Sequence, residues 1–206
     1  MIIEGITVGP FMTNCFILAC EEKKEGVIID PGDEAEHILR RVNECGVSVK
    51  KIINTHAHID HVGAVQEIKD KLGVKFYLHR SEEFILDTYE YQCRLFGVRF
   101  GAQPEADGFI EEGDVISVGK IEMRAILTPG HSPGGLCFLT DDKVFVGDTL
   151  FYGSIGRTDL PGGSYETLIA GIKTKLLTLP EETEVFCGHG PETTIGREKW
   201  TNPFLV

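Results

Sequence analysis

The stretch that decides the fold and the chemistry of this chain is Thr55-His56-Ala57-His58-Ile59-Asp60-His61. It gathers three of the seven histidines of the chain and one carboxylate within positions 56–61. Imidazole and carboxylate side chains are ligands for zinc, iron and similar metals, and a motif of this density is a specific signal. The pattern therefore predicts a metal site, the alternative being a polar loop with solvated histidines.

The composition is that of an acidic globular protein. The length fits one domain over residues 1–206, and 42% apolar residues are enough for a sizeable core. A net charge of −12 argues against nucleic-acid binding, which needs clusters of Lys and Arg. We see neither a secretory signal nor an apolar run of membrane-spanning length. We therefore expect a cytoplasmic protein with reduced cysteines and no nucleic-acid or membrane partner.

Hydrophobic periodicity predicts strands and helices arranged in two successive halves. In the first half, strands are expected at residues 2–8, 13–20, 26–29, 49–53 and 75–78, helices at 33–45, 64–72 and 81–96, and an irregular connection at 98–108. In the second half, strands are expected at 115–118, 121–127, 136–139, 144–146 and 184–187, with helices at 165–177 and 193–200. Helices that cover sheets in both halves predict an α+β layered sandwich.

Four more candidate residues stand in the turns at the ends of predicted strands: Asp30, His131, Asp148 and His189. Loops at strand ends on a rigid scaffold are where functional residues usually lie. Five histidines and two aspartates are too many for one tetrahedral ion, but they suit two ions. Two ions about 3.5–4 Å apart share a hydroxide that is nucleophilic at neutral pH. The sequence thus predicts two divalent ions, zinc being the first expectation and iron or manganese the alternatives.

The order of these residues along nearly the whole chain resembles the metallo-β-lactamase superfamily. The resemblance implies an αββα four-layer sandwich with the site at the edge where the two halves meet. Asp30 matches the first motif of that superfamily and is implied to orient the ligands rather than to bind metal. The implied ligands are His56, His58 and His131 for one metal, Asp60, His61 and His189 for the other, and Asp148 as the bridge.

Asp148 stands where the main zinc β-lactamases carry cysteine, and it is similar to the glyoxalase II type, which hydrolyses thioesters of glutathione. The segment 153–163 resembles compact bacterial glyoxalase II-like hydrolases. Two departures concern the glutathione-binding part of that family. Because the sequence reaches only to Val206, we expect no helical domain of the kind that helps to clasp glutathione. Asp159 replaces an aromatic residue two positions after the basic Arg157.

By this resemblance the expected reaction is hydrolysis of a small-molecule thioester, such as S-lactoylglutathione, through attack by a metal-bridging hydroxide on the carbonyl carbon. Asp60 is the candidate catalytic residue, since its carboxylate can steer or take the proton of the hydroxide. Arg157 is a candidate anchor for a substrate carboxylate. A loop-stabilising pair between Arg157 and Asp159 is the equally weighted alternative.

Two other readings stay open. A mononuclear-iron persulfide dioxygenase shares the scaffold and a Gly-Arg-Thr-Asp stretch, matching residues 156–159 here. That family reads Ala-His-Asp-Tyr around the last histidine, where this chain has Gly188-His189-Gly190-Pro191. A non-catalytic module stabilised by metal is disfavoured, because closed structural zinc sites favour cysteine ligands. The number of bound metal ions separates the two enzyme readings.

Overall fold

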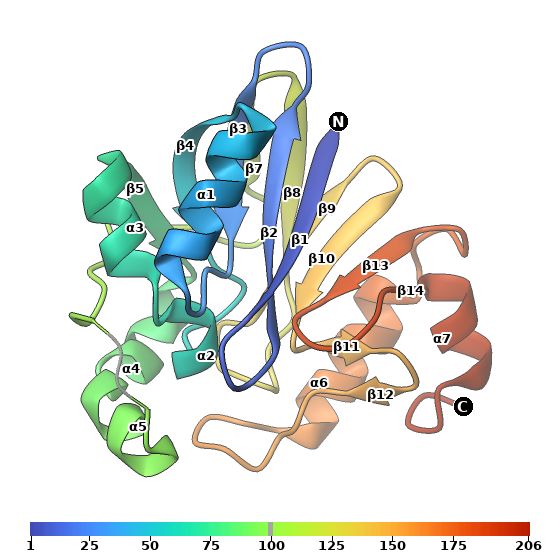
Figure 1. Cartoon of the computed structure of the whole chain (residues 1–206). Helices are drawn as coiled ribbons and strands as arrows, with labels where there is room; N and C mark the ends of the chain where they lie inside the picture. The colour runs from blue at the N-terminus through green and yellow to red at the C-terminus, as the bar shows by residue number, and fades with distance from the viewer. Residues whose placement is uncertain (99–100) are drawn as a thin grey trace.

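Two six-stranded sheets lie face to face in the computed structural model of the chain, which describes residues 1–98 and 101–206 (Figure 1). The first sheet takes its strands in chain order: β1 (Ile2–Val8), β2 (Thr13–Cys20), β3 (Glu25–Ile29), β4 (Ser48–Ile53), β5 (Lys75–Leu78) and β6 (Gly108–Phe109). The second sheet has the order β14 (Thr193–Thr194), β13 (Glu184–Cys187), β10 (Lys143–Gly147), β9 (Leu136–Thr140), β8 (Ile121–Leu127) and β7 (Val115–Val118). A small hairpin of β11 (Leu150–Phe151) and β12 (Ser154–Ile155) follows β10.

Helices cover the outer face of each sheet (Figure 1). The first sheet is covered by α1 (Ala35–Cys45) and α3 (Val65–Leu72), and the second by α6 (Tyr165–Gly171), the π-helical turn η2 (Ile172–Leu176) and α7 (Ile195–Thr201). The short helices α2 (Ile59–Val62), η1 (Arg80–Glu82), α4 (Glu83–Leu86) and α5 (Tyr89–Phe96) lie at one edge. The order helix, sheet, sheet, helix confirms the αββα sandwich. None of the helices in the two described ranges is long and apolar enough to cross a membrane.

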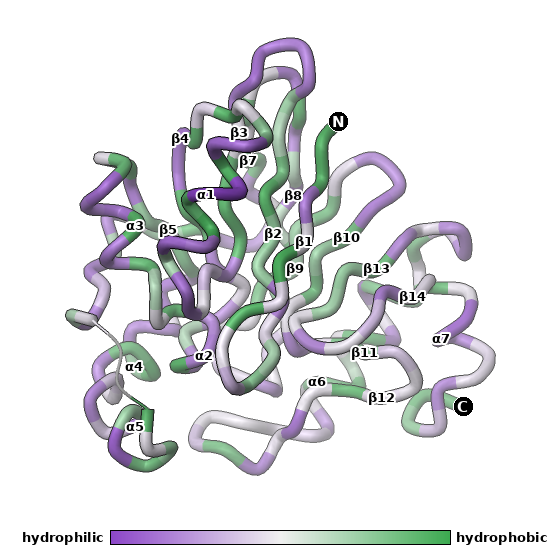
Figure 2. Tube along the Cα trace, in the orientation of Figure 1, coloured by the Kyte–Doolittle hydropathy of each residue, from purple (hydrophilic) through white to green (hydrophobic). Residues whose placement is uncertain are grey.

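The strand β2 shows why the sequence forms two sheets with separate cores. Its side chains alternate between two apolar layers, as successive residues of a strand must. Cys15 and Ile17 pack under the helices of the first half, whereas Phe16 and Leu18 pack against the second sheet. A strand buried on both faces reads as a continuous apolar run. Figure 2 shows such apolar residues along the central strands, with hydrophilic residues mainly on loops and helices.

Three phenylalanines form the centre of the layer between the sheets. The rings of Phe145 and Phe186 stack with their centroids 4.9 Å apart, and Phe16 from the first sheet meets the Phe145 ring edge-on at 5.2 Å. Such aromatic pairs add to the hydrophobic gain from their burial. This cluster therefore joins the two sheets.

The helix expected over residues 81–96 is broken into three pieces, and this prediction was wrong in its continuity. The carbonyl of Ile85 accepts hydrogen bonds from the Thr88 hydroxyl at 2.7 Å and from the Gln92 amide at 3.0 Å. Side chains that bond the backbone in this way compete with helix propagation. The irregular connection expected at 98–108 includes residues 99 and 100, which lie outside the described residues.

We predict that Phe145→Ala lowers the free energy of unfolding by about 3–5 kcal/mol, because it leaves a cavity between the sheets. Urea denaturation at fixed metal content measures the change. Phe204→Ala is the control, since Phe204 is 43% exposed, and it should change stability by less than about 0.5 kcal/mol. Equal effects of the two variants would contradict the role of Phe145.

Candidate metal centre

All the predicted metal ligands follow strands that end at one edge of the sandwich, beside the short helices. A loop at the carboxyl end of a strand is held by the rigid sheet behind it. The strands and the residues they lead to are β3 and Asp30, β4 and the loop His56–His61, β8 and His131, β10 and Asp148, and β13 and His189. The structure therefore brings together residues from both halves of the chain.

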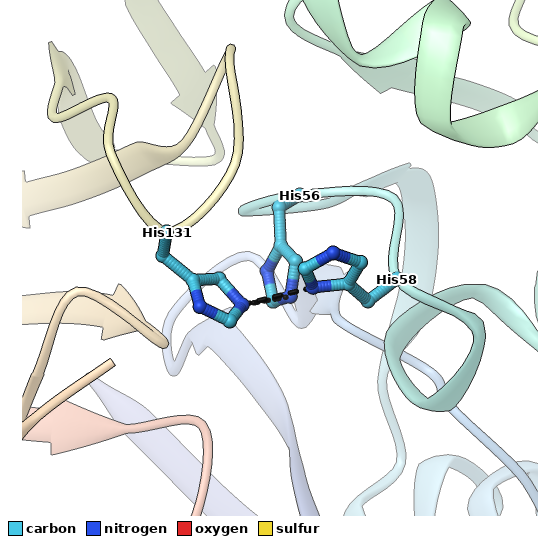
Figure 3. Close-up of side chains that lie close together, drawn as sticks. All are labelled: His56, His58 and His131. Atoms are coloured by element: carbon cyan, nitrogen blue, oxygen red, sulfur yellow. Dashed lines mark hydrogen bonds between the residues drawn. The ribbon is translucent and has the colours of Figure 1, made fainter. Parts of the chain in front are cut away.

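His56, His58 and His131, here called the first trio, point their ring nitrogens at one another (Figure 3). The His131 Nε2 atom lies 2.8 Å from His58 Nδ1 and 3.3 Å from His56 Nε2. All three side chains are buried. Three converging imidazoles are a suitable set of ligands for one divalent metal ion.

Hydrogen bonds on the other ring nitrogens fix which nitrogens of the first trio carry lone pairs. His131 Nδ1 donates to the Arg157 carbonyl at 2.8 Å, and His56 Nδ1 lies 3.0 Å from the Thr55 hydroxyl. Both Nε2 atoms are therefore free to bind metal. Burial and the neighbouring histidines hold the pKa of His56 well below its usual value, and burial lowers the pKa of His58 to about 3. Neutral rings with converging lone pairs fit a cation.

Asp60, His61 and His189, here called the second trio, meet beside the first. Asp60 Oδ2 lies 3.1 Å from His189 Nε2 and 3.6 Å from His61 Nε2. Burial by itself would lower the pKa of His61, but the Asp60 and Asp148 carboxylates raise it well above its usual value. The pKa of His189 is also raised, because its hydrogen bond to Asp60 and the charge of Asp148 outweigh its burial. The Asp60 carboxylate and the neighbouring Asp148 therefore make this trio the one that favours positive charge.

Asp148 lies between the two trios, with Oδ1 facing the second trio and Oδ2 facing both. Its Oδ1 is 3.3 Å from His61 Nε2, and its Oδ2 is 3.5 Å from His189 Nε2 and 3.6 Å from His131 Nε2. His61 Nε2 and Asp148 Oδ1 are buried and have no hydrogen-bond partner among the described residues. Buried polar atoms need a partner, and metal ions would provide one. The arrangement fits two adjacent divalent ions with Asp148 between them.

A glycine permits this close approach. A Cβ atom on Gly188 would lie 2.2 Å from Asp148 Oδ1 and 2.8 Å from the His61 ring. Any other residue at position 188 would push these two groups apart. Glycine at position 188, beside the candidate ligand His189, therefore has a steric reason.

Asp30 supports the histidine loop through three hydrogen bonds. Its Oδ1 accepts from the Thr55 backbone N–H at 2.7 Å, and its Oδ2 accepts from the Thr55 hydroxyl at 2.6 Å and faces His61 Nδ1 at 3.0 Å. Asp30, His56 and His61 also form a compact group of possible ligands. Because the Asp30 oxygens are already occupied, we interpret this residue as one that orients His61, and this role stays a prediction.

Glu82 is an important residue that the sequence analysis missed. Its side chain is fully buried, and it accepts hydrogen bonds from the backbone N–H groups of Ala57 at 2.8 Å and Gly134 at 2.6 Å. Ala57 stands between His56 and His58, and Gly134 belongs to the loop that carries His131. One carboxylate therefore ties together the two loops that form the first trio.

Three amide side chains, also missed, hold the backbone of the other ligand loops. Asn54 donates to the His61 carbonyl at 2.7 Å, and Asn14 donates to the Cys187 carbonyl at 3.0 Å. Gln92 accepts from the Ile59 N–H at 3.0 Å. Asn54 gave a detectable signal, since it is a polar residue at the end of a buried strand; the other two gave none.

A cavity of about 490 Å³ opens onto both trios and is lined by side chains of α4, α5 and the segment after β12. Arg157 is one of its lining residues. The guanidinium of Arg157 makes two hydrogen bonds to Asp159, at 2.7 and 2.8 Å. The pairing expected as the alternative is therefore present, and a role for Arg157 in binding a substrate carboxylate stays a prediction.

Comparison with known sequences identifies a family and two informative relatives. The profile of the metallo-beta-lactamase superfamily matches residues 8–189. The hydroxyacylglutathione hydrolase GloC of Haemophilus influenzae is 39% identical over 214 residues, covering 100% of this chain and 98% of that protein. The probable metallo-hydrolase YqgX of Bacillus subtilis is 42% identical over 202 residues, covering 96% and 94%.

Three solved structures share the fold over nearly the whole chain. The B3 metallo-beta-lactamase BLEG-1 has a TM-score of 0.92 and 39% identity, covering 100% of both chains. TTHA1623 in a di-iron-bound form has a TM-score of 0.90 and 40% identity, covering 98% of this chain and 100% of its own. ETHE1 from Myxococcus xanthus has a TM-score of 0.84 and 27% identity, covering 98% and 84%.

We predict that Glu82→Gln weakens metal binding about 10–100-fold, as is usual when a group that orients metal ligands is lost. The glutamine amide group can accept only one of the two backbone N–H groups that Glu82 accepts, and its own N–H₂ would face the other. The unsatisfied donor also destabilises the fold by about 1–3 kcal/mol. Metal affinity by competition with a chelator and urea denaturation measure the two effects. Glu83→Gln, at the adjacent exposed glutamate, is the matched control. An unchanged metal affinity in Glu82→Gln would contradict the role of this residue.

Acidification is expected to release metal from the second trio before the first. The raised pKa values of His61 and His189 mean that these rings take up protons earlier as the pH falls, and protons compete with metal. The lowered pKa values of His56 and His58 delay that competition in the first trio. Metal content measured between about pH 7.5 and pH 5 should fall from about two ions per chain to about one. Loss of both ions in a single step would contradict this order.

Proposed function

Because the chain belongs to the metallo-beta-lactamase superfamily, we propose that it is a dinuclear metallohydrolase that cleaves small-molecule thioesters, with S-lactoylglutathione as the first substrate to test. The observation that carries the proposal is the position of Asp148, whose two oxygens face both trios. The likeness to GloC supports a thioester as the bond that is cleaved. A cytoplasmic location is part of the proposal, supported by six free cysteines.

The proposed reaction adds water across the carbon–sulfur bond. The oxygen of water bonds to the carbonyl carbon, the carbon–sulfur bond breaks, and the sulfur leaves as a thiolate that ends as a thiol after protonation. Two divalent ions, whether zinc, iron or manganese, would supply an activated water and polarise the carbonyl when bound. A thiolate leaves readily, so the reaction requires no separate general acid.

The protein residues in this proposal position the reacting groups. His56, His58 and His131 would hold one ion, with Asp60, His61 and His189 on the other. Asp60 stays ionised at neutral pH, because His61 and His189 lower its pKa in spite of its burial. The Thr13 hydroxyl donates to Asp60 Oδ2 at 3.1 Å and fixes its orientation. Asp60 is thereby placed to accept a hydrogen bond from the attacking water.

The alternative is a persulfide dioxygenase with one iron, and the likeness to ETHE1 fits either reading. The geometry of Asp148 favours the hydrolase, since a carboxylate that faces both trios can serve two ions. The likeness to TTHA1623 in its di-iron-bound form is consistent with two ions of iron as well as of zinc. A non-catalytic module is less favoured, because a cavity opens directly onto the trios.

The test is the rate of S-lactoylglutathione hydrolysis by protein of measured metal content. We expect saturable turnover at about two ions per chain. Asp148→Asn should lower kcat/KM by more than about 100-fold. Loss of a residue that only orients metal ligands typically costs about 10–100-fold. Asp142→Asn is the matched control, since Asp142 is exposed and pairs with Lys143, and it should leave the rate unchanged.

Two outcomes would contradict the proposal. Absence of turnover with S-lactoylglutathione and with other thioesters, at full metal loading, would exclude a thioester hydrolase. Binding of one iron per chain, together with oxygen consumption in the presence of a persulfide, would establish the dioxygenase instead.

A further inference from the structure

The cavity beside the metal centre has an apolar wall and an apolar rim. Large side chains from α4 and α5 form the outer part: Phe84 is 56% exposed, Tyr91 59% and Leu95 58%. Phe96 lies next to them and meets the Phe11 ring edge-on at 5.7 Å. Contiguous exposed apolar side chains of this kind mark a surface that binds an apolar group. Here the surface continues inward to the metal-facing residues.

Apart from the Tyr91 hydroxyl, the polar side chains of the α4 and α5 wall are already bonded. Thr88 donates its hydroxyl to the Ile85 carbonyl at 2.7 Å. Gln92 uses its carbonyl oxygen on Ile59 and its amide on Ile85 and Thr88. These groups stabilise the short helices and leave little hydrogen-bonding capacity for a ligand.

The cavity also offers little charge to a ligand away from the metal-facing residues. Among the described lining residues, Arg157 is the one cationic side chain apart from histidines, and both of its hydrogen bonds to Asp159 are short. The glutathione part of a thioester carries two carboxylates and one ammonium. Placing such charges in an apolar cavity without partners is costly.

We infer that the substrate carries an uncharged apolar group next to its scissile bond, and that Phe84, Tyr91 and Leu95 bind this group. The inference rests on the proposed function, in that the scissile bond is taken to be a thioester. The apolar group belongs either to the acyl half or to the thiol half of the substrate. In both cases the reaction gives one carboxylic acid and one thiol by addition of one water.

The first experiment measures kcat/KM for two series of thioesters with the metal-loaded protein. One series attaches acetyl, butanoyl, hexanoyl and octanoyl groups to N-acetylcysteamine, which is uncharged. The other attaches an acetyl group to alkanethiols of increasing length. We expect kcat/KM to rise about fourfold for each added methylene that is buried, in one of the two series. Both the hexanoyl and the octanoyl substrate should exceed S-lactoylglutathione if the acyl half is the apolar one.

The second experiment measures binding without turnover. Calorimetric titration of the metal-loaded protein with butanoate, hexanoate and octanoate should show Kd falling about fourfold per buried methylene. This readout is independent of whether the bond that the protein cleaves is a thioester.

A pair of variants locates the apolar group. Leu95→Asp places a charge on the cavity rim, and we expect it to lower the ratio of octanoate to butanoate affinity by about tenfold. Val115→Asp is the matched control, because Val115 is 57% exposed on β7 and does not line this cavity. The control should keep the ratio of the unmodified protein.

The outcomes separate the inference from the proposed function. Thioester turnover that does not rise with chain length in either series, or a carboxylate affinity independent of chain length, overturns the inference and leaves the hydrolase in place. Chain-length-dependent binding without turnover of any thioester supports the inference and overturns the proposed function. Equal effects of Leu95→Asp and Val115→Asp on the affinity ratio overturn the inference that the rim residues bind the apolar group.

Discussion

The metal centre depends on one buried carboxylate, Asp30, at the end of β3. Its two oxygens accept from both the backbone and the side chain of Thr55 and face His61 Nδ1. These contacts bind the start of the histidine loop to the neighbouring strand. They also direct the other ring nitrogen of His61 toward Asp60 and Asp148. Without this carboxylate, the start of the histidine loop and the buried His61 ring would lose the hydrogen bonds that orient them.

The same kind of hydrogen bond orients three other imidazoles of the site, each with a different partner. His131 is fixed by the Arg157 carbonyl, His189 by the Phe11 carbonyl and His56 by the Thr55 hydroxyl. In each case the bond is made by Nδ1, so that Nε2 points to the shared space. The centre is therefore preorganised by hydrogen bonds that reach back to rigid strand ends. The apolar wall of the cavity beside the centre comes from other elements, the short helices α4 and α5.

The group of candidate ligands could be predicted because ligand chemistry restricts residue types and because the main motif is local. The positions of His131, Asp148 and His189 followed from their places after predicted strands. Glu82 could not be predicted, since it stands beside Glu83 and only the folded structure decides which of the two is buried. The pattern over 81–96 predicted helix where η1, α4 and α5 lie. It did not show the break, which depends on hydrogen bonds made by the side chains of Thr88 and Gln92.

The origin of the ligands in both halves has a consequence for the life of the protein in the cell. His58 and His131 are 73 residues apart along the chain, and Thr13 of the first sheet reaches the same centre. An ion bound there is a cross-link that favours the native over the unfolded chain, and linkage gives about 4 kcal/mol when free metal exceeds Kd a thousandfold. Loss of metal would lower the stability of the native chain by this amount, and a change of that size is enough to alter the abundance of a protein in the cell several-fold.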